Sequence, residues 1–208
     1  MSTVLFVKAN DRDIEQATSV KLYQAFLDSY KASNPEDTIV ELDLFKEELP
    51  YMNANMINGN FKAARGYDLT AEEQAAVTVS DKYINQFLAA DKVVFAFPLW
   101  NFTVPAVLHT YIDYLSQAGK TFSYTAEGPV GLIPDKKVAL LNARGGIYSE
   151  GPAASVEMSY NFIRTVMGFY GVKNLESVIV EGHNQLPDQA EAIVSNGIEQ
   201  AKKVAAGF

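Results

Sequence analysis

An aromatic and amide-bearing segment, Leu99–Phe102 with sequence LWNF, follows directly after a strand-like apolar run, Lys92–Phe97. Nearly continuous apolar runs are typical of parallel strands that are covered on both faces. Ligands of open α/β sheets bind beyond the carboxyl ends of such strands, so the Trp, Asn and Phe side chains are expected to face a crevice. The alternative is a loop whose aromatic side chains only pack against the protein.

A second loop, Asn142–Gly146 with sequence NARGG, follows another apolar run, Lys137–Asn142. Its adjacent glycines, Gly145 and Gly146, lack Cβ atoms, so their backbone N–H groups can approach the edge of a flat ligand closely. Both loops follow parallel strands, so they are expected side by side at one sheet edge, where they would share a pocket. A diglycine alone is more often an ordinary turn, and its place at a strand end is what favours binding.

A third loop, Ala9–Thr18, joins the first predicted strand to a helix that begins near Thr18 and Ser19. The free N–H groups and the positive dipole end of a helix start can hold a phosphate, with Lys8 or Arg12 as charge partners. The alternative is that Thr18 or Ser19 simply caps the helix. Together, the three loops describe a seat for a phosphorylated planar cofactor across three strand ends, and FMN has that shape.

Five strand-like segments alternate with five segments of helical spacing. Strands are expected at Thr3–Lys8, Thr38–Leu44, Lys92–Phe97, Lys137–Asn142 and Leu175–Glu181. Helices are expected from Ser19 to about Lys31, from a Thr70–Glu73 capping box to about Ala90, from Val104 to about Ala118, from about Ala154 to Phe169, and from Asp188 to about Ala206. This alternation predicts the α/β class and a three-layer α/β/α sandwich, with a five-stranded parallel sheet of flavodoxin-like order 2-1-3-4-5. No linker divides residues 1–208, so one domain is expected.

Two connections, Phe45–Leu69 and Gly119–Lys136, are longer than is usual between such elements. Both contain aromatic residues, among them Tyr67 in the first and Phe122 and Tyr124 in the second. Exposed aromatic side chains suit a partner subunit or a planar ligand, whereas packing within the loop is the alternative.

The composition restricts the classes of partner. With 17 Lys and Arg against 25 Asp and Glu, the formal net charge is -8, which disfavours nucleic acid and anionic membranes as partners. There is no cysteine, and His109 and His183 do not stand in a metal-ligand spacing, so no catalytic metal is expected. No apolar run is long enough to span a membrane and no signal segment is visible, so a cytoplasmic protein is expected.

The chain resembles the FMN-dependent NADH:azoreductase and quinone reductase family of flavodoxin-like proteins. The resemblance is carried by VLFVK, by FPLWNFTVPAVLHTYIDYLSQAGKTFSYTAEGPVGL, by NARGG and by the closing IVEG of the last predicted strand. It implies bound FMN, NADH as co-substrate with NADPH as an alternative, and a homodimer with a flavin site near each end of its interface.

The same resemblance gives roles to individual residues. An aromatic-Asn-Phe triplet of the family is matched by Trp100, Asn101 and Phe102, and an Arg-Gly-Gly triplet by Arg144, Gly145 and Gly146. Both triplets would contact the flavin ring. Tyr148, often His in relatives, would lie near the pyrimidine end. The predicted cofactor-binding set is Asn10, Ala17, Thr18, Ser19, Pro98, Leu99, Trp100, Asn101, Phe102, Asn142, Ala143, Arg144, Gly145, Gly146 and Tyr148. The predicted phosphate-binding loop departs from that of relatives, which is richer in Ser and Gly, by containing Asn10, Asp11 and Asp13.

The implied reaction is ping-pong transfer through flavin N5, with quinones as preferred acceptors and aromatic azo compounds as further ones. No side chain need act as a nucleophile. The aromatic walls of the acceptor site are predicted to be Phe102, Tyr124 and Phe169, with Trp100 nearby. For Phe169 and Trp100, packing in the core is the alternative.

Two other functions remain open. A flavodoxin-like electron carrier would bind FMN but would not turn over NADH, and the two long aromatic connections argue against it. A hydrolase or phosphodiesterase would need a nucleophile, yet the chain has no G-x-S-x-G motif, and no serine partner can be identified for His183.

Overall fold

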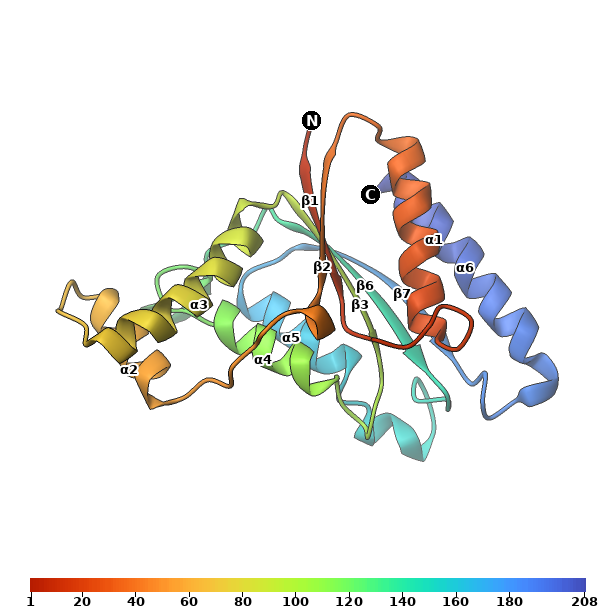
Figure 1. Ribbon diagram of the computed structural model, residues 1–208. Coiled ribbons are helices and arrows are strands. Elements are labelled where there is room, and N and C mark those ends of the chain that lie inside the picture. The colour runs from red at the N-terminus through yellow and green to blue at the C-terminus, as the bar shows by residue number, and fades with distance from the viewer.

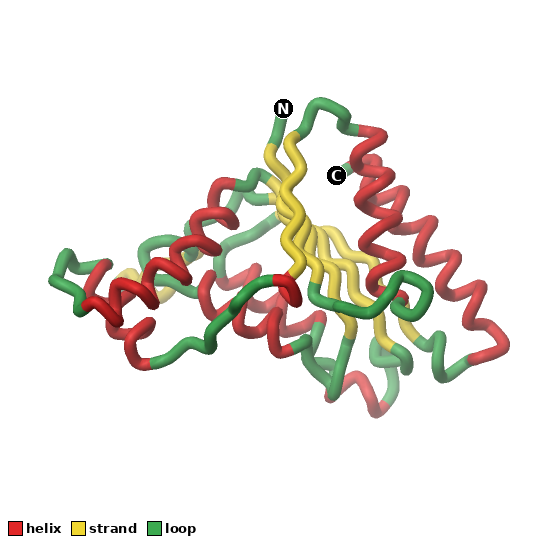
Figure 2. The backbone as a smooth tube through the Cα atoms, in the orientation of Figure 1, coloured by secondary structure: helices red, strands yellow, loops and turns green.

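A five-stranded, all-parallel sheet forms the middle of the protein (Figures 1 and 2). The computed structural model describes residues Met1–Phe208 and orders the strands β2-β1-β3-β6-β7. The strands are β1 (Thr3–Lys8), β2 (Thr38–Asp43), β3 (Lys92–Pro98), β6 (Lys137–Arg144) and β7 (Asn174–Glu181). Counting only these five strands, the order is 2-1-3-4-5, so the predicted flavodoxin-like sheet is confirmed.

Helices cover both faces of this sheet (Figure 1). On one face lie α1 (Thr18–Ser33) and α6 (Ala190–Gly207), and on the other lie α3 (Ala71–Ala89), α4 (Ala106–Leu115) and α5 (Tyr160–Phe169). Successive strand residues point to opposite faces, so each strand supplies two cores. In β1, for example, Val4 and Phe6 pack toward α1 and α6, whereas Leu5 and Val7 pack toward the other layer. Burial on both sides is the reason why the three inner strands, β1, β3 and β6, are nearly continuous apolar runs.

The predicted capping box at Thr70 and Glu73 is present at the start of α3. The Glu73 amide donates to Thr70 Oγ1 at 3.2 Å, and the Thr70 amide donates to Glu73 Oε2 at 2.9 Å. The Glu73 side chain is also paired with Lys62 at 2.7 Å, which ties α3 to a helix that the sequence did not predict.

That helix, α2 (Ala54–Ala63), lies inside the long Phe45–Leu69 connection, so the prediction of five helices was wrong by one. Its sequence, ANMINGNFKA, contains three Asn and one Gly, which have low helix propensity. It forms because Asn53 caps its start by accepting from the Met56 amide at 3.1 Å, and because Met56 and Gly59 are buried.

The second long connection also has structure of its own, a hairpin of β4 (Phe122–Thr125) and β5 (Gly128–Gly131). It lies against the end of α5, where a Cβ on Gly131 would stand only 2.1 Å from the Gly171 backbone nitrogen. A glycine at 131 is therefore what allows the hairpin to dock.

Helix α5 starts six residues later than the predicted Ala154, since a short 3₁₀ helix, Pro152–Val156, precedes it. The strands β3 and β6 also extend beyond their predicted ends, to Pro98 and Arg144. No helix has the length and the apolar character that crossing a membrane requires.

Candidate functional site

A crevice formed by two adjoining cavities lies beyond the carboxyl ends of β1, β3 and β6. The first cavity, of about 310 Å³, is lined by Asn10, Arg12, Gln16, Ala17, Thr18, Ser19, Pro98, Leu99, Trp100, Ala143, Gly145, His183 and Asn184. The second, of about 500 Å³, is lined by Leu99, Asn101, Phe102, Gly145, Gly146, Tyr148, Asn184 and Gln185. The two share Leu99, Gly145 and Asn184, so they are parts of one site. Every predicted cofactor-binding residue except Asn142 and Arg144 lines one of them.

The start of α1 forms one end of the crevice and has no side-chain cap. Ala17 occupies the N-cap position, so the alternative in which Thr18 or Ser19 caps the helix does not apply. The backbone N–H groups of Thr18 and Ser19 have no acceptor within the chain. A helix start with free amides and the positive end of the dipole is a site that favours anions.

Asn10 shapes the loop that leads into this helix start. Its Nδ2 donates to Ser19 Oγ at 2.9 Å, and its Oδ1 accepts from the Arg12 amide at 3.1 Å. The Asn10 side chain is itself buried. Asn10 therefore fixes the path of the loop and leaves the α1 amides open.

The two candidate charge partners differ in position. Arg12 lines the first cavity and can supply a positive charge there. Lys8 does not line the cavity, because its Nζ pairs with Asp43 Oδ2 at 2.8 Å on the adjoining strand β2. The suggestion that Lys8 supports an anion at α1 is therefore wrong.

His183 is a lining residue that the sequence analysis did not assign to this site. Its Nε2 lies 3.4 Å from Thr18 Oγ1, and its Nδ1 is buried without a partner. Burial lowers the pKa of His183, and the positive charge of Lys21 lowers it further. A hydrolytic triad would require a third group that orients the imidazole, and none is present, so the pair with Thr18 gives no support to a hydrolase.

The loop after β3 is a tight turn with unusual backbone angles. Trp100 and Thr103 exchange backbone hydrogen bonds at 2.9 and 3.1 Å. Between them, Asn101 and Phe102 have φ values of 50° and 71°. Positive φ suits Asn but is uncommon for a bulky residue, so the turn holds Phe102 at a cost in free energy. The result is a Phe side chain that is 48% exposed beside the second cavity.

The loop after β6 presents two further free amides. The N–H groups of Gly145 and Gly146 have no acceptor within the chain. A Cβ on Gly145 would stand 2.4 Å from Asn184 Nδ2, so the absence of a side chain is what lets Asn184 lie against this loop. The pair can therefore offer hydrogen-bond donors to a flat ligand, as their position at a strand end predicts.

Tyr148 lines the second cavity next to these glycines. Its ring lies 3.2 Å from the position that a Cβ on Gly146 would occupy, and its backbone N–H donates to Glu181 Oε2 at 2.8 Å. The aromatic ring is thus held beside the free amides by a hydrogen bond made by its own backbone.

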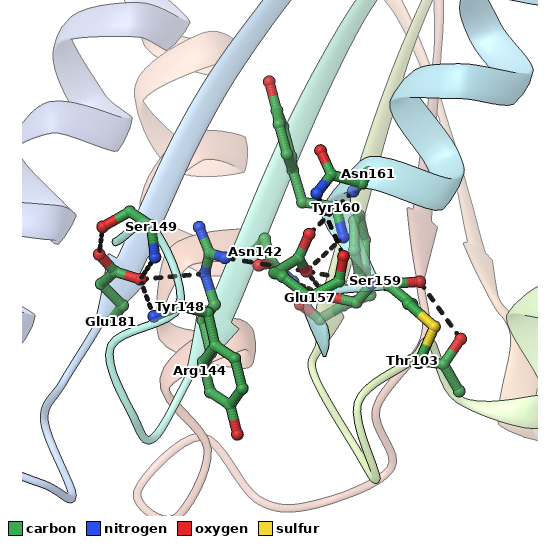
Figure 3. A network of polar contacts seen from close by, with 12 residues as sticks. Thr103, Asn142, Arg144, Tyr148, Ser149, Glu157, Ser159, Tyr160, Asn161 and Glu181 are labelled. Carbon is green, nitrogen blue, oxygen red and sulfur yellow. Dashed lines mark hydrogen bonds and ion pairs between the residues drawn. The ribbon is translucent and has the colours of Figure 1, made fainter. Parts of the chain in front are cut away.

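Asn142 and Arg144 do not line the crevice, and their side chains lie beside Ser159 and Glu157 at the start of α5 (Figure 3). Asn142 is fully buried and donates to Phe97 O and Ser159 Oγ, both at 3.3 Å. The reason is strand geometry, because β6 continues through Arg144 and residues two apart face the same side. The prediction that the Arg144 side chain contacts a flavin ring is not supported by this placement.

Tyr124 and Phe169 are also away from the crevice within one chain. They pack around Phe122 in the hairpin region, with ring centroids 5.5 and 4.6 Å from that of Phe122. Tyr124 is 72% exposed and Phe169 is 39% exposed, so neither serves as core. Trp100 does line the first cavity and meets Phe45 edge to face at 6.3 Å.

The crevice therefore combines an anion seat, a slot with aromatic and amide groups, and backbone donors on loops from three strands. This set fits a ligand with a phosphate at one end and a planar, hydrogen-bonding ring system at the other, which matches FMN.

Comparisons with known proteins agree with this geometry. A family model described as flavodoxin-like fold matches residues 2–205. The FMN-dependent NADH:quinone oxidoreductase 3 of Bacillus cereus is 68% identical over 208 residues, covering 100% of both chains. A crystal structure of an azoreductase from Bacillus anthracis is also 68% identical, with a TM-score of 0.99 and complete coverage of both chains. An FMN-dependent NADH-azoreductase from Bacillus anthracis, solved in complex with FMN, is 28% identical with a TM-score of 0.91, covering 99% of this chain and 98% of that one.

Proposed function

Since the chain belongs to the flavodoxin-like family that includes FMN-dependent NADH:quinone oxidoreductases and azoreductases, we propose that it binds FMN and passes two electrons from NADH to quinones and azo compounds. The observation that carries the proposal is the set of backbone amides without acceptors along one crevice. Thr18 and Ser19 supply them at the helix start, and Gly145 and Gly146 supply them beside the slot.

These groups assign positions to the parts of FMN. The phosphate would bind at the start of α1, where two free amides, the Thr18 hydroxyl and Arg12 converge on the first cavity. The ring system would lie in the slot between Leu99 and Gly145, which line both cavities. The amides of the glycine pair would then donate to the polar edge of the ring and favour negative charge on it.

When bound, FMN would supply the redox chemistry, a ping-pong transfer of hydride from NADH to the acceptor through flavin N5. The chain holds and orients the reactants, so no nucleophile is needed from it. NADH is the proposed donor because the relatives are named for it, and NADPH is the alternative to be measured beside it.

The acceptor would stack near Phe102, the exposed aromatic side chain at the second cavity. We place Tyr124 and Phe169 at the same acceptor site through a homodimer, in which the hairpin of one subunit reaches the crevice of the other. The support is that both rings are exposed in one chain and are held together by Phe122.

The dimer arrangement predicts that Tyr124→Ala lowers acceptor turnover by about tenfold, as the loss of one aromatic contact would. Binding of FMN should not change, because Tyr124 lies away from the crevice of its own chain. Light scattering measures the oligomeric state in parallel. A monomer whose turnover is unaffected by Tyr124→Ala would contradict the arrangement.

The proposed function is tested by the visible spectrum of the purified protein, recorded anaerobically before and after addition of NADH. Flavin bands that bleach with NADH and return with a quinone are the expected result. Flavin that NADH and NADPH both fail to bleach would instead indicate an electron carrier. A colourless protein that takes up no added FMN would overturn the proposal.

A further inference from the structure

Arg144 is a buried cation that the site described above does not use. Only 4% of its side chain is exposed, although it is the last residue of β6 and precedes the glycine pair directly. It lies between two carboxylates from different segments, Glu181 and Glu157 (Figure 3). Arg144 Nε is 3.4 Å from Glu181 Oε2, and Arg144 Nη1 is 3.8 Å from Glu157 Oε1.

The Glu181 carboxylate holds the loop that follows the glycine pair. It accepts the backbone N–H groups of Tyr148 at 2.8 Å and of Ser149 at 3.1 Å, and also the hydroxyl of Ser149. Through Glu181, Arg144 is therefore connected to the residues that line the second cavity beside Gly146.

The Glu157 carboxylate holds the start of α5. It accepts the backbone N–H groups of Ser159 at 3.0 Å, Tyr160 at 2.9 Å and Asn161 at 3.0 Å, and the Ser159 hydroxyl at 2.6 Å. Burial alone raises the pKa of Glu157, but these hydrogen bonds outweigh burial, so its pKa lies below the usual value and the carboxyl is charged.

The segment that bears Glu157 also holds the turn that contains Phe102. The Met158 amide donates to the Phe102 carbonyl at 2.9 Å, and Thr103 Oγ1 donates to the Met158 carbonyl at 3.3 Å. These bonds help to keep Phe102 at its positive φ. A second chain of contacts thus runs from Arg144 through Glu157 to the other side of the slot.

We propose that Arg144 is a positioning residue whose two ion pairs hold the Gly145–Ser149 loop and the Trp100–Thr103 turn at a fixed separation across the slot. This inference rests on the proposed function, because it takes the slot to be the flavin and acceptor site. Glu181 holds the Gly145–Ser149 loop and Glu157 holds the segment that contacts the Trp100–Thr103 turn. Arg144 links the two because it is paired with both carboxylates. Glu157 is buried and Glu181 is partly buried, so without the guanidinium between them the two carboxylates would lose a shared counter-charge.

The two carboxylates predict different defects. Glu181→Gln should loosen the loop of Tyr148 and Ser149 and raise the dissociation constant for FMN about tenfold, with little change in the acceptor KM. Glu157→Gln should loosen the turn of Phe102 and raise the acceptor KM about tenfold, with little change in FMN affinity. Arg144→Met should produce both defects together.

Hydrogen exchange on the apoprotein tests the linkage without any flavin, since exchange reports local opening. Arg144→Met should raise exchange at Tyr148 and Ser149 and also at Ser159–Asn161. Each glutamine variant should raise exchange only in its own segment. Glu199→Gln is the matched control, because it breaks an exposed ion pair with Lys202 on α6 and should change neither segment.

The outcomes separate the two proposals. A wild-type protein that binds no FMN would overturn the proposed function, while the exchange pattern would still test the linkage. If Arg144→Met changes exchange in neither segment, or if the two glutamine variants give the same defect in FMN affinity and acceptor KM, Arg144 is not the positioning residue. Should Arg144→Met fail to fold, the comparison of the two glutamine variants decides.

Discussion

The amino-terminal and carboxyl-terminal ends of the sheet strands, called here the amino edge and the carboxyl edge, differ in whether nearby polar groups have partners within the chain. At the amino edge, Lys136 donates to the carbonyls of Leu88 and Ala90 at the end of α3, and Asp91 accepts the Thr3 amide at 2.8 Å. At the carboxyl edge, by contrast, the amides at the start of α1 and in the glycine loop have no acceptor. Because buried polar groups are usually paired, an edge that leaves donors open beside a cavity is an edge prepared for a ligand.

The largest effect is expected when the free amides at the carboxyl edge are given an acceptor from the chain itself. Ala17→Asp would place a carboxylate at the N-cap of α1, where it could accept the free amides. FMN affinity should fall at least about a hundredfold, because the carboxylate occupies the amides and repels the phosphate. The apoprotein should gain about 1 kcal/mol of stability from the new cap. Fluorescence titration of FMN and urea unfolding of the apoprotein measure the two effects.

Gln189→Asp is the matched control for that change. Gln189 precedes α6, which likewise has no side-chain cap. The control adds the same negative charge at another helix start and should leave FMN affinity unchanged, whereas its effect on stability should be smaller, because Gln189 has helical rather than extended backbone angles. Equal loss of affinity in both variants would mean that the α1 amides have no special part in binding.

The next effect is a dependence of stability on pH, which is expected from Lys136 at the amino edge. Burial lowers the pKa of Lys136 from 10.5 to about 8. Between these values the unfolded chain keeps a proton that the folded chain has released, so stability should rise with pH. The free energy of unfolding of the wild type, relative to Lys136→Met, should rise between pH 8 and pH 10 by up to about 1.4 kcal/mol per pH unit. A flat difference would indicate a lysine with an ordinary pKa.

The smallest effect is expected for the Trp100–Thr103 turn at the carboxyl edge. Phe102→Gly and Phe102→Ala both remove the ring, but only glycine adopts a φ of 71° without strain. The glycine variant should therefore be more stable than the alanine variant by about 1 kcal/mol. Thermal unfolding of the two apoproteins measures this difference, and equal stabilities would show that the backbone at Phe102 is not strained.

The fold could be predicted because alternation between apolar strands and helical segments is a property of long stretches of sequence. The carboxyl-edge rule then located the site at Leu99–Phe102 and at Gly145–Gly146. The same rule, applied to the end of β7, would also have found His183 and Asn184, which line the first cavity.

The directions of side chains were harder to predict. Taking β6 to end at Asn142 treated Arg144 as part of a loop, whereas the strand includes it. Strand alternation then turns both residues to the side of Val138 and Leu140, toward α5 and away from the crevice. A strand two residues longer than expected therefore directs the charged Arg144 side chain away from the crevice.

Helix α2 and the place of Tyr124 were also hard to predict. Asn53 caps α2 locally, by accepting from the Met56 amide, but the three Asn and one Gly of the helix disfavour it, and burial of Met56 and Gly59 is what stabilises it. Tertiary packing overrides local propensity in such segments.

The uncapped start of α1 has a consequence for how long the protein lasts in a cell. A molecule that binds only the folded chain adds stability according to its free concentration, by about 2.7 kcal/mol at one hundred times the dissociation constant. Chains made in excess of the available flavin would lack that protection and would be degraded first. The supply of flavin in the cell would therefore affect the abundance of this protein as well as its activity.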